Sequence, residues 1–255
     1  MPDVRIDGLT VAYDRAGDGP PLLLLHGVLE DARIWRRQRE SLADGFDVIA
    51  WDAPGCGRSD DPPVGFDYTA CLVGFVEALG VRPHVLGLSW GGGLAMDLAA
   101  RRPDLVERLV LCDTYAGWKG SLPAEEVRRR LEQCRREVGL PAEAFIPDWM
   151  PGLLARPDPA LVDEVTAIMS DFHPAGYRAM IEAFAELDLR PLLTGIAHPT
   201  LLLWGAEDAR SPVSVAADLR SQLPDARLHV IPGAGHLSHL DAPEAFDAAV
   251  RDFLT

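Results

Sequence analysis

The chain has little positive charge. Its 255 residues include 24 Lys and Arg against 39 Asp and Glu, which gives a formal net charge of -15 at pH 7. A surface this acidic repels nucleic acid phosphates and anionic lipid headgroups, so we expect neither nucleic acid nor membrane as a partner. The basic runs Arg128–Arg130 and Arg135–Arg136 lie among Glu residues at helical spacing. They predict a solvated helix face rather than an anion site.

Cysteines and long apolar runs are also scarce. The four cysteines, Cys56, Cys71, Cys112 and Cys134, have neither the paired spacing of a metal site nor the density of a disulfide scaffold. No apolar run approaches the roughly 20 residues of a membrane span. The first fourteen residues predict a strand and turn rather than a signal peptide. These features together predict a cytoplasmic protein without metal or other cofactor.

What the chain does contain is short apolar runs in alternation with helical patterns. The runs are continuous, as is typical of strands covered on both faces, and lie at 21–25, 46–52, 84–88, 108–112, 200–204 and 228–231. Helical patterns lie at 34–43, 68–79, 91–101, 213–223 and 243–254. This order predicts an α/β fold with a mostly parallel, doubly wound sheet of about eight strands. A hairpin around Asp7-Gly8 is expected at one edge.

One stretch breaks this alternation. Residues 118–190 contain only helical patterns, at 123–138, 141–154, 159–170 and 174–186, and each opens at or near a proline. We expect a helical cap there, inserted after the sixth strand, with core segments 1–117 and 191–255 on either side. Ligands bind at the carboxyl ends of the strands in open α/β sheets, so this cap is expected to cover a pocket for a small molecule.

The strongest chemical signal is the segment Gly87-Leu88-Ser89-Trp90-Gly91. It fits the pattern G-x-S-x-G and stands between a predicted strand and a predicted helix. A serine on such a strained turn projects its hydroxyl outward, and glycines two residues away on either side let neighbouring backbones pass closely. We therefore predict that Ser89 is a nucleophile. The alternative is a Gly/Ser-rich turn without a chemical role.

A serine hydroxyl needs a base, and the base needs an acid that orients it. His236 follows the last predicted strand, at the same end of the sheet as Ser89, and is the predicted base. His239 is expected to be a structural neighbour. Asp208, directly after strand 200–204, is the predicted acid, and the chain order Ser, Asp, His is typical of this architecture. Asp113, which follows strand 108–112, is the alternative acid.

A developing oxyanion needs backbone donors that are already in place. We predict the N–H groups of Trp90 and Val28 in this role, with His26 hydrogen-bonded inside its own loop. Four aromatic cap residues are candidates for substrate contact, although packing of the cap helices is the plainer explanation for any single one: Trp118, Trp149, Phe172 and Tyr177. Arg156 or Arg178 would serve a substrate with a second carbonyl or carboxylate.

In this order the motifs resemble the α/β-hydrolase superfamily, in its branch with a serine nucleophile and a helical cap. The resemblance covers essentially the whole chain and rests on His26-Gly27, the segment 52–59 (DAPGCGRS), Gly87–Gly91, Gly205–Asp208 and Gly235-His236. It implies that segment 52–59 is a structural turn. The serine stands where haloalkane dehalogenases and epoxide hydrolases carry an aspartate, so their chemistry is not expected.

The segment GLSWGGGLAM and the short cap look similar to enol-lactone hydrolases and related esterases. The resemblance implies hydrolysis of a small-molecule carboxylic ester or lactone through an acyl-enzyme. Three alternatives stay open: C–C bond hydrolysis of a diketone or dienoic acid, a non-hydrolytic lyase, cyclase or acyl transferase, and a binding protein without catalysis. A fold alone does not name a substrate, and the sequence predicts no oligomeric state.

Overall fold

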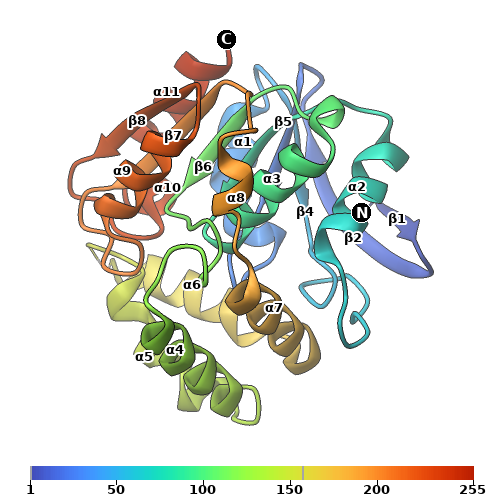
Figure 1. Cartoon of the computed structure of the whole chain (residues 1–255). Coiled ribbons are helices and arrows are strands. Elements are labelled where there is room, and N and C mark those ends of the chain that lie inside the picture. The colour runs from blue at the N-terminus through green and yellow to red at the C-terminus, as the bar shows by residue number, and fades with distance from the viewer. Residues whose placement is uncertain (1, 157) are drawn as a thin grey trace.

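The computed structural model describes residues 2–156 and 158–255. Met1 and Pro157, which fall in the expected first core segment and in the expected cap, lie outside the described residues. Within these ranges eight strands form one sheet in the order β1-β2-β4-β3-β5-β6-β7-β8 (Figure 1). The strands are β1 Asp3–Ile6, β2 Leu9–Ala16, β3 Pro21–Leu25, β4 Asp47–Trp51, β5 His84–Leu88, β6 Leu109–Cys112, β7 Thr200–Gly205 and β8 Ala226–Ile231.

The sheet is mostly parallel, as predicted. β2 pairs antiparallel with both β1 and β4, and every other neighbouring pair is parallel. β1 and β2 form the expected hairpin, in which Asp7 and Gly8 both have positive φ, 49° and 90°. β3 to β7 are buried along almost their whole length. Their continuous apolar runs therefore reflect coverage of both faces of the sheet.

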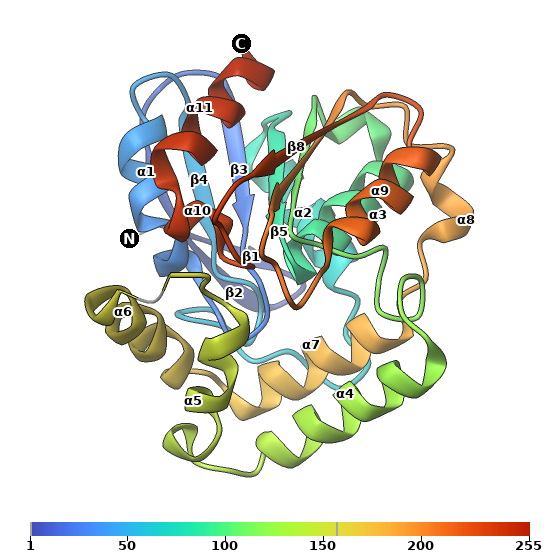
Figure 2. The same ribbon diagram turned by 90° about the vertical axis from the view of Figure 1, so that its left-hand side faces the viewer.

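Helices cover both faces of the sheet (Figure 2). α1 and α11 contact each other on one face, and α2, α3 and α9 lie on the other. Their bounds agree with the predicted segments within one residue, apart from the start of α1, which lies two residues later because a 3-10 helix at Ala32–Trp35 precedes it. The α-helices that accompany the sheet are α1 Arg36–Leu42, α2 Tyr68–Leu79, α3 Trp90–Arg101, α8 Arg190–Leu193, α9 Val213–Gln222, α10 Ser238–Asp241 and α11 Pro243–Leu254.

One strand differs from its prediction. β8 begins at Ala226, two residues before the apolar run, and its side chains alternate between partly buried and exposed over most of its length. β8 is the last strand in the sheet order, so it has a neighbour on one side only and lies at the margin of the core. Continuous apolarity is therefore not required there, and an apolar run underestimates the length of such an edge strand.

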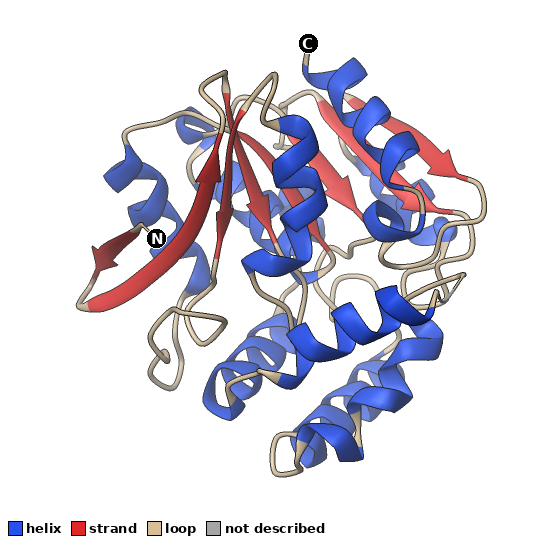
Figure 3. Ribbon diagram, turned by 180° about the vertical axis from the view of Figure 1, so that it is seen from behind, coloured by secondary structure: helices blue, strands red, loops and turns tan. Residues whose placement is uncertain are grey.

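After β6 and before α8, four α-helices of the described chain lie together beyond one end of the sheet (Figure 3). We call this segment the insertion; its helices are α4 Ala124–Glu137, α5 Ile146–Trp149, α6 Pro159–Ser170 and α7 Pro174–Glu186. The prediction of one helix over 141–154 is wrong. Short 3-10 helices at Ala142–Ala144 and Met150–Gly152 flank α5 instead. Pro147 and Pro151 each lack an amide hydrogen and clash with the preceding turn, so a continuous helix cannot form.

The insertion is joined to the core at several points. Arg36 Nη2 lies 2.8 Å from Glu164 Oε1 on α6, and the Ala155 amide donates to Asp241 Oδ2 over 2.9 Å. The closest approach involves two glycines: a Cβ atom on Gly176 would lie 2.1 Å from the Gly55 carbonyl oxygen. These contacts hold the insertion helices over the carboxyl ends of the strands. No helix among the described residues is long and apolar enough to cross a membrane.

Candidate active site

Ser89 occupies a strained turn between β5 and α3. Its φ of 51° and ψ of -116° lie in a region that L-residues rarely adopt. A Cβ atom on Gly87 would lie 2.4 Å from the Gly91 carbonyl oxygen, and one on Gly91 would lie 2.4 Å from that of Leu25. Glycine is therefore required on both sides of Ser89, for the steric reason that the motif suggested. Strain of this kind persists where the surrounding structure imposes it, often at functional sites.

His236 and Asp208 form a buried pair at the same end of the sheet. His236 Nδ1 lies 2.9 Å from Asp208 Oδ2, and the side chains of both residues are almost fully buried. The other carboxylate oxygen, Oδ1, accepts hydrogen bonds from the amides of Arg210 and Ser211, over 2.8 Å and 2.9 Å. Asp208 is therefore held on both sides. An Nδ1–H donated to Asp208 leaves His236 Nε2 as the ring acceptor.

The alternative acid, Asp113, has other partners. Its Oδ1 accepts from the Gly205 amide over 2.8 Å, and its Oδ2 accepts from Ser238 Oγ over 2.5 Å. The side chain is fully buried, and burial followed by the nearby charge of Asp208 raises the pKa of Asp113 well above its usual value. Asp113 therefore links the end of β7 to α10, and the structure places His236 against Asp208.

The loop after β3 stands beside Ser89. Its His26 is buried, with Nδ1 2.8 Å from the Gly27 carbonyl and Nε2 accepting from the Ala53 amide over 3.1 Å, so it holds this loop to the next one. Val28 is half-buried and lines the same pocket as Ser89. The Trp90 amide is at the first position of α3, where backbone N–H groups have no partner within the helix and the helix dipole is positive.

One pocket brings these residues together. It contains about 410 Å³ of unoccupied space, counting its open mouth. Its walls come from both the core and the insertion. Ser89, His236 and Val28 line it together with aromatic and apolar side chains, Tyr115, Trp118, Trp149, Leu153 and Phe184, and with three charged residues, Glu30, Arg130 and Arg210.

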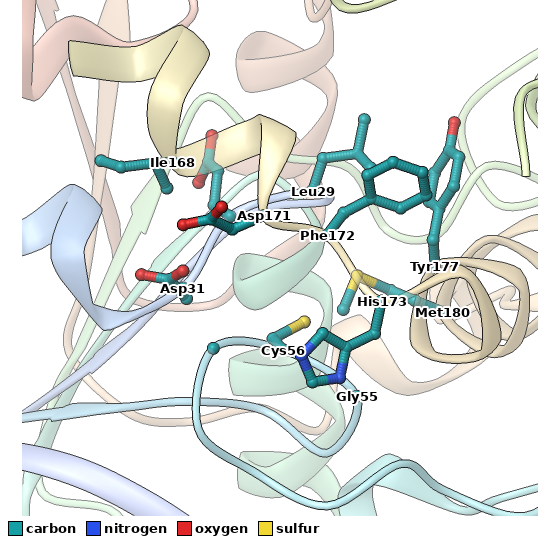
Figure 4. Close-up of a pocket in the computed structure, with 12 residues that line it drawn as sticks. Leu29, Asp31, Gly55, Cys56, Ile168, Asp171, Phe172, His173, Tyr177 and Met180 are labelled. Carbon is teal, nitrogen blue, oxygen red and sulfur yellow. The ribbon is translucent and has the colours of Figure 1, made fainter. Parts of the chain in front are cut away.

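The four aromatic candidates divide between two places. Trp118 and Trp149 line the pocket that contains Ser89. Phe172 and Tyr177 line a separate, smaller cavity between the insertion and the loop around Cys56 (Figure 4). The Tyr177 hydroxyl donates to Glu137 over 2.6 Å, and its ring stacks on Phe145. Phe172 and Tyr177 therefore contribute to packing within the insertion.

The three charged residues of the pocket, Glu30, Arg130 and Arg210, were not predicted as site residues from the sequence. The prediction of a solvated face is wrong for Arg130, which donates to the Tyr115 hydroxyl over 3.1 Å from Nη1. Arg130, Cys134 and Glu137 share one face of α4 by their spacing, but a face without an apolar stripe carries no signal of burial. Arg210 is two residues after Asp208, and this short distance in the sequence from the predicted acid could have indicated that Arg210 lies near the site. The arginines considered instead lie elsewhere: Arg178 is exposed, and Arg156 lies against Gly233.

Burial changes the acid chemistry of the third charged residue. Glu30 is 5% exposed, and its Oε2 accepts from the Gly27 amide over 2.8 Å. Burial raises the pKa of Glu30 to about 8, while the Gly27 amide and the more distant charge of Arg210 oppose that rise. Glu30 is therefore mostly uncharged near neutral pH. Among the described residues no group of three or more His, Cys, Asp or Glu is arranged to hold a metal ion.

The sequence and structure both have known relatives. Residues 22–249 match the sequence model of the alpha/beta hydrolase family. A thermophilic esterase from Thermogutta terrifontis is 33% identical, with a TM-score of 0.87 over 100% of this chain and 98% of that one. The enol-lactonase from Burkholderia xenovorans is 26% identical, with a TM-score of 0.87 over 99% of both chains. Haloalkane dehalogenase 2 of Mycobacterium tuberculosis is 31% identical over 94% of this chain and 90% of its own length.

Proposed function

Because this chain belongs to the alpha/beta hydrolase family, we propose that it is a serine hydrolase that cleaves a small-molecule carboxylic ester or lactone. The observation that carries this proposal is the presence of Ser89 and His236 in one pocket, with His236 Nδ1 2.9 Å from Asp208 Oδ2. The similar esterase and enol-lactonase support the substrate class, since esters and lactones both contain an acyl carbonyl.

In the proposed mechanism Ser89 Oγ attacks the substrate carbonyl while His236 Nε2 takes its proton. Asp208 holds the Nδ1–H tautomer of His236 and stabilises the imidazolium that forms. The amides of Val28 and Trp90 donate hydrogen bonds to the oxyanion, and one such donor is worth about 3–4 kcal/mol in comparable sites. His236 then protonates the leaving alcohol, and a water molecule attacks the acyl-enzyme by the same route.

The proposal extends to the organisation and location of the protein. We assign residues 118–190 as a cap over the active site, between core segments 1–117 and 191–255, because Trp118, Arg130 and Trp149 cover the pocket that contains Ser89. All four cysteines are free and buried, which favours a cytoplasmic location. The acidic chain favours a small-molecule substrate over nucleic acid or membrane partners.

The first test is covalent labelling. A fluorophosphonate probe should add one label to the wild-type protein, measured by intact mass, and none to Ser89→Ala. Ser221→Ala is the matched control, since Ser221 is exposed on α9 away from the pocket, and it should label like the wild type. Turnover of p-nitrophenyl acetate and of a simple lactone should disappear in Ser89→Ala only. Labelling or normal turnover in a folded Ser89→Ala would refute the proposal.

A C–C bond hydrolase is the second candidate. The observation that favours it is Glu30, whose burial keeps a protonated carboxyl in the pocket with Ser89. Cleavage of a β-diketone leaves a carbanion or enol that needs a proton, and such a carboxyl is a suitable donor. Wild-type protein that cleaves a β-diketone faster than the matched ester would favour this candidate. Cleavage of the ester alone would exclude it.

A further inference from the structure

We infer that the substrate carries a carboxylate, and that Arg130 and Arg210 bind this group inside the pocket that contains Ser89. The inference rests on the proposed function and adds a substrate class to it. Both guanidinium groups line the same pocket as Ser89 and His236.

Arg210 is a cation without a carboxylate partner among the described residues. Its guanidinium lies over the ring of Trp149, with Cζ 4.0 Å from the ring centroid, and no ion pair to Arg210 is found in the described ranges. Its Nε is shielded from solvent and has no hydrogen-bond partner. A cation–π contact stabilises the charge but accepts no N–H hydrogen bond. No described residue accepts a hydrogen bond from the Arg210 side chain, so an acceptor in the pocket would meet N–H donors that the protein itself does not use.

Arg130 is close to Arg210 and is only partly neutralised. Its Nη2 lies 3.4 Å from the Arg210 carbonyl oxygen, and its Nε lies 2.7 Å from Glu126 Oε1. Glu126 also pairs with Arg129, so one carboxylate serves two guanidinium groups. Burial, and then the nearby charge of Arg130, lower the pKa of Arg210, which agrees with two cations placed close together. A shared anion would relieve this repulsion.

The nearby acids do not remove this positive charge. Glu30 is mostly uncharged near neutral pH because burial raises its pKa to about 8. Asp208 attracts Arg210 electrostatically, but its carboxylate is hydrogen-bonded to His236 and to the backbone amides of Arg210 and Ser211 rather than to a guanidinium group. Asp148 lines the adjoining cavity but is exposed to solvent. Two guanidinium groups in this pocket, one of them without an ion-pair partner among the described residues, favour an anionic ligand even though the chain has a net charge of -15.

The position of the two arginines defines the kind of anion. Arg130 and Arg210, with Trp118 and Trp149, line both the pocket of Ser89 and an adjoining cavity that opens outward, with about 680 Å³ of unoccupied space counting its open mouth. The arginines therefore stand at the junction, beside the reacting carbonyl rather than on it. Planar guanidinium groups match the two oxygens of a carboxylate. A substrate with its acyl carbonyl at Ser89 and its carboxylate at this junction is a half-ester, or a lactone with a carboxylate side chain.

The test measures how fast the full-length protein hydrolyses two matched ester substrates. One is the mono-p-nitrophenyl ester of adipic acid, and the other is its primary amide, which has nearly the same shape without the charge. Wild-type kcat/KM should favour the acid by about tenfold or more, which a charged hydrogen-bonded pair supplies. In Arg210→Gln and Arg130→Gln the ratio of the two kcat/KM values should fall toward one. Arg128→Gln is the control, because Arg128 is exposed on the same helix, and it should keep the wild-type ratio.

A second measurement needs no arginine variant. Calorimetry with Ser89→Ala should detect binding of adipate but not of its diamide. Equal kcat/KM for the two esters in a wild-type protein that labels at Ser89 would overturn the inference and leave the proposed function intact. Absence of labelling and turnover would instead refute the proposed function, and binding of adipate to Ser89→Ala would then still support the arginine site. If adipate does not bind to Ser89→Ala, the inference of a carboxylate site at Arg130 and Arg210 is overturned.

Discussion

The backbone N–H of Arg210 donates a hydrogen bond to Asp208 Oδ1 over 2.8 Å. The turn that holds the proposed acid therefore also sets the start of the arginine side chain that enters the pocket. Because Asp208 Oδ2 contacts His236, one short segment after β7 orients both the base and the proposed anion-binding group. Displacement of this turn is expected to affect both the rate of acylation and the preference for charged substrates.

Separate substitutions of the two candidate acids, Asp208 and Asp113, should distinguish their roles. Asp208→Asn should slow acylation by about 10⁴-fold, because the amide favours the wrong His236 tautomer. Asp113→Asn should instead lower the free energy of unfolding by about 1–3 kcal/mol, since its carboxyl links Gly205 to Ser238 in the buried interior. Stopped-flow acylation and urea unfolding of both variants would measure these effects. An unchanged acylation rate in Asp208→Asn would move the acid to Asp113.

Glu30 should make the protein less stable at higher pH. Its folded pKa of about 8 is above the ordinary value of 4.5, so the folded state binds an extra proton between these two values. The contribution of Glu30 is fully present below about pH 4.5 and is lost as the pH rises toward the folded pKa. Glu30→Gln keeps an acceptor for the Gly27 amide without titrating. Its unfolding free energy should exceed that of the wild type by an amount that grows between pH 5 and 8, to an order of a few kcal/mol. Parallel stability profiles for the two proteins would contradict this.

His239 should act in the opposite direction at lower pH. It is buried against Trp35, with ring centroids 4.5 Å apart, and burial lowers its pKa to about 3. The unfolded chain therefore takes up a proton that the folded protein refuses, and stability falls as the pH drops below about 6.5. His239→Phe keeps an aromatic ring between Trp35 and Phe246 without a proton site. Chemical unfolding between pH 4 and 7 should show a flatter profile for this variant, and an equally steep one would be evidence against a buried neutral His239.

The approach of Gly176 to Gly55 should control how the insertion sits on the core. In Gly176→Ala the new methyl would lie 2.1 Å from the Gly55 carbonyl oxygen, so the start of α7 must shift. We expect a loss of stability of about 1–3 kcal/mol and a raised KM, because pocket walls on the insertion move with it. Gly139→Ala is the control in the same segment, since the nearest atom to its methyl would be 3.8 Å away. Thermal unfolding would measure the stability of both variants, and ester kinetics would measure their KM. Wild-type stability and KM in Gly176→Ala would show that this contact does not hold the insertion.

Local patterns in the sequence were enough to place most elements of the core. Residues 68–79 and 243–254 agree with α2 and α11 in both bounds, because their patterns end at glycine, proline or the chain terminus. The helix expected over 141–154 failed for a local reason as well, since Pro147 and Pro151 interrupt it. The length of β8 was underestimated because side chains exposed at the edge of the sheet need not be apolar. One error therefore had a local cause, the two prolines, and the other arose because the absence of a neighbouring strand changes the environment of β8.

The sequence by itself determined the order of the elements and, through it, that Ser89 and His236 follow strands of one sheet. Parallel strands bring their carboxyl ends to one edge, so residues that follow different strands meet there. Only the tertiary structure decided that His236 lies against Asp208 while Asp113 pairs with Gly205 and Ser238. It also decided that Arg130 and Arg210 turn into the pocket. These choices depend on contacts between side chains far apart in the chain, and no local spacing encodes which buried partner a charged group will find.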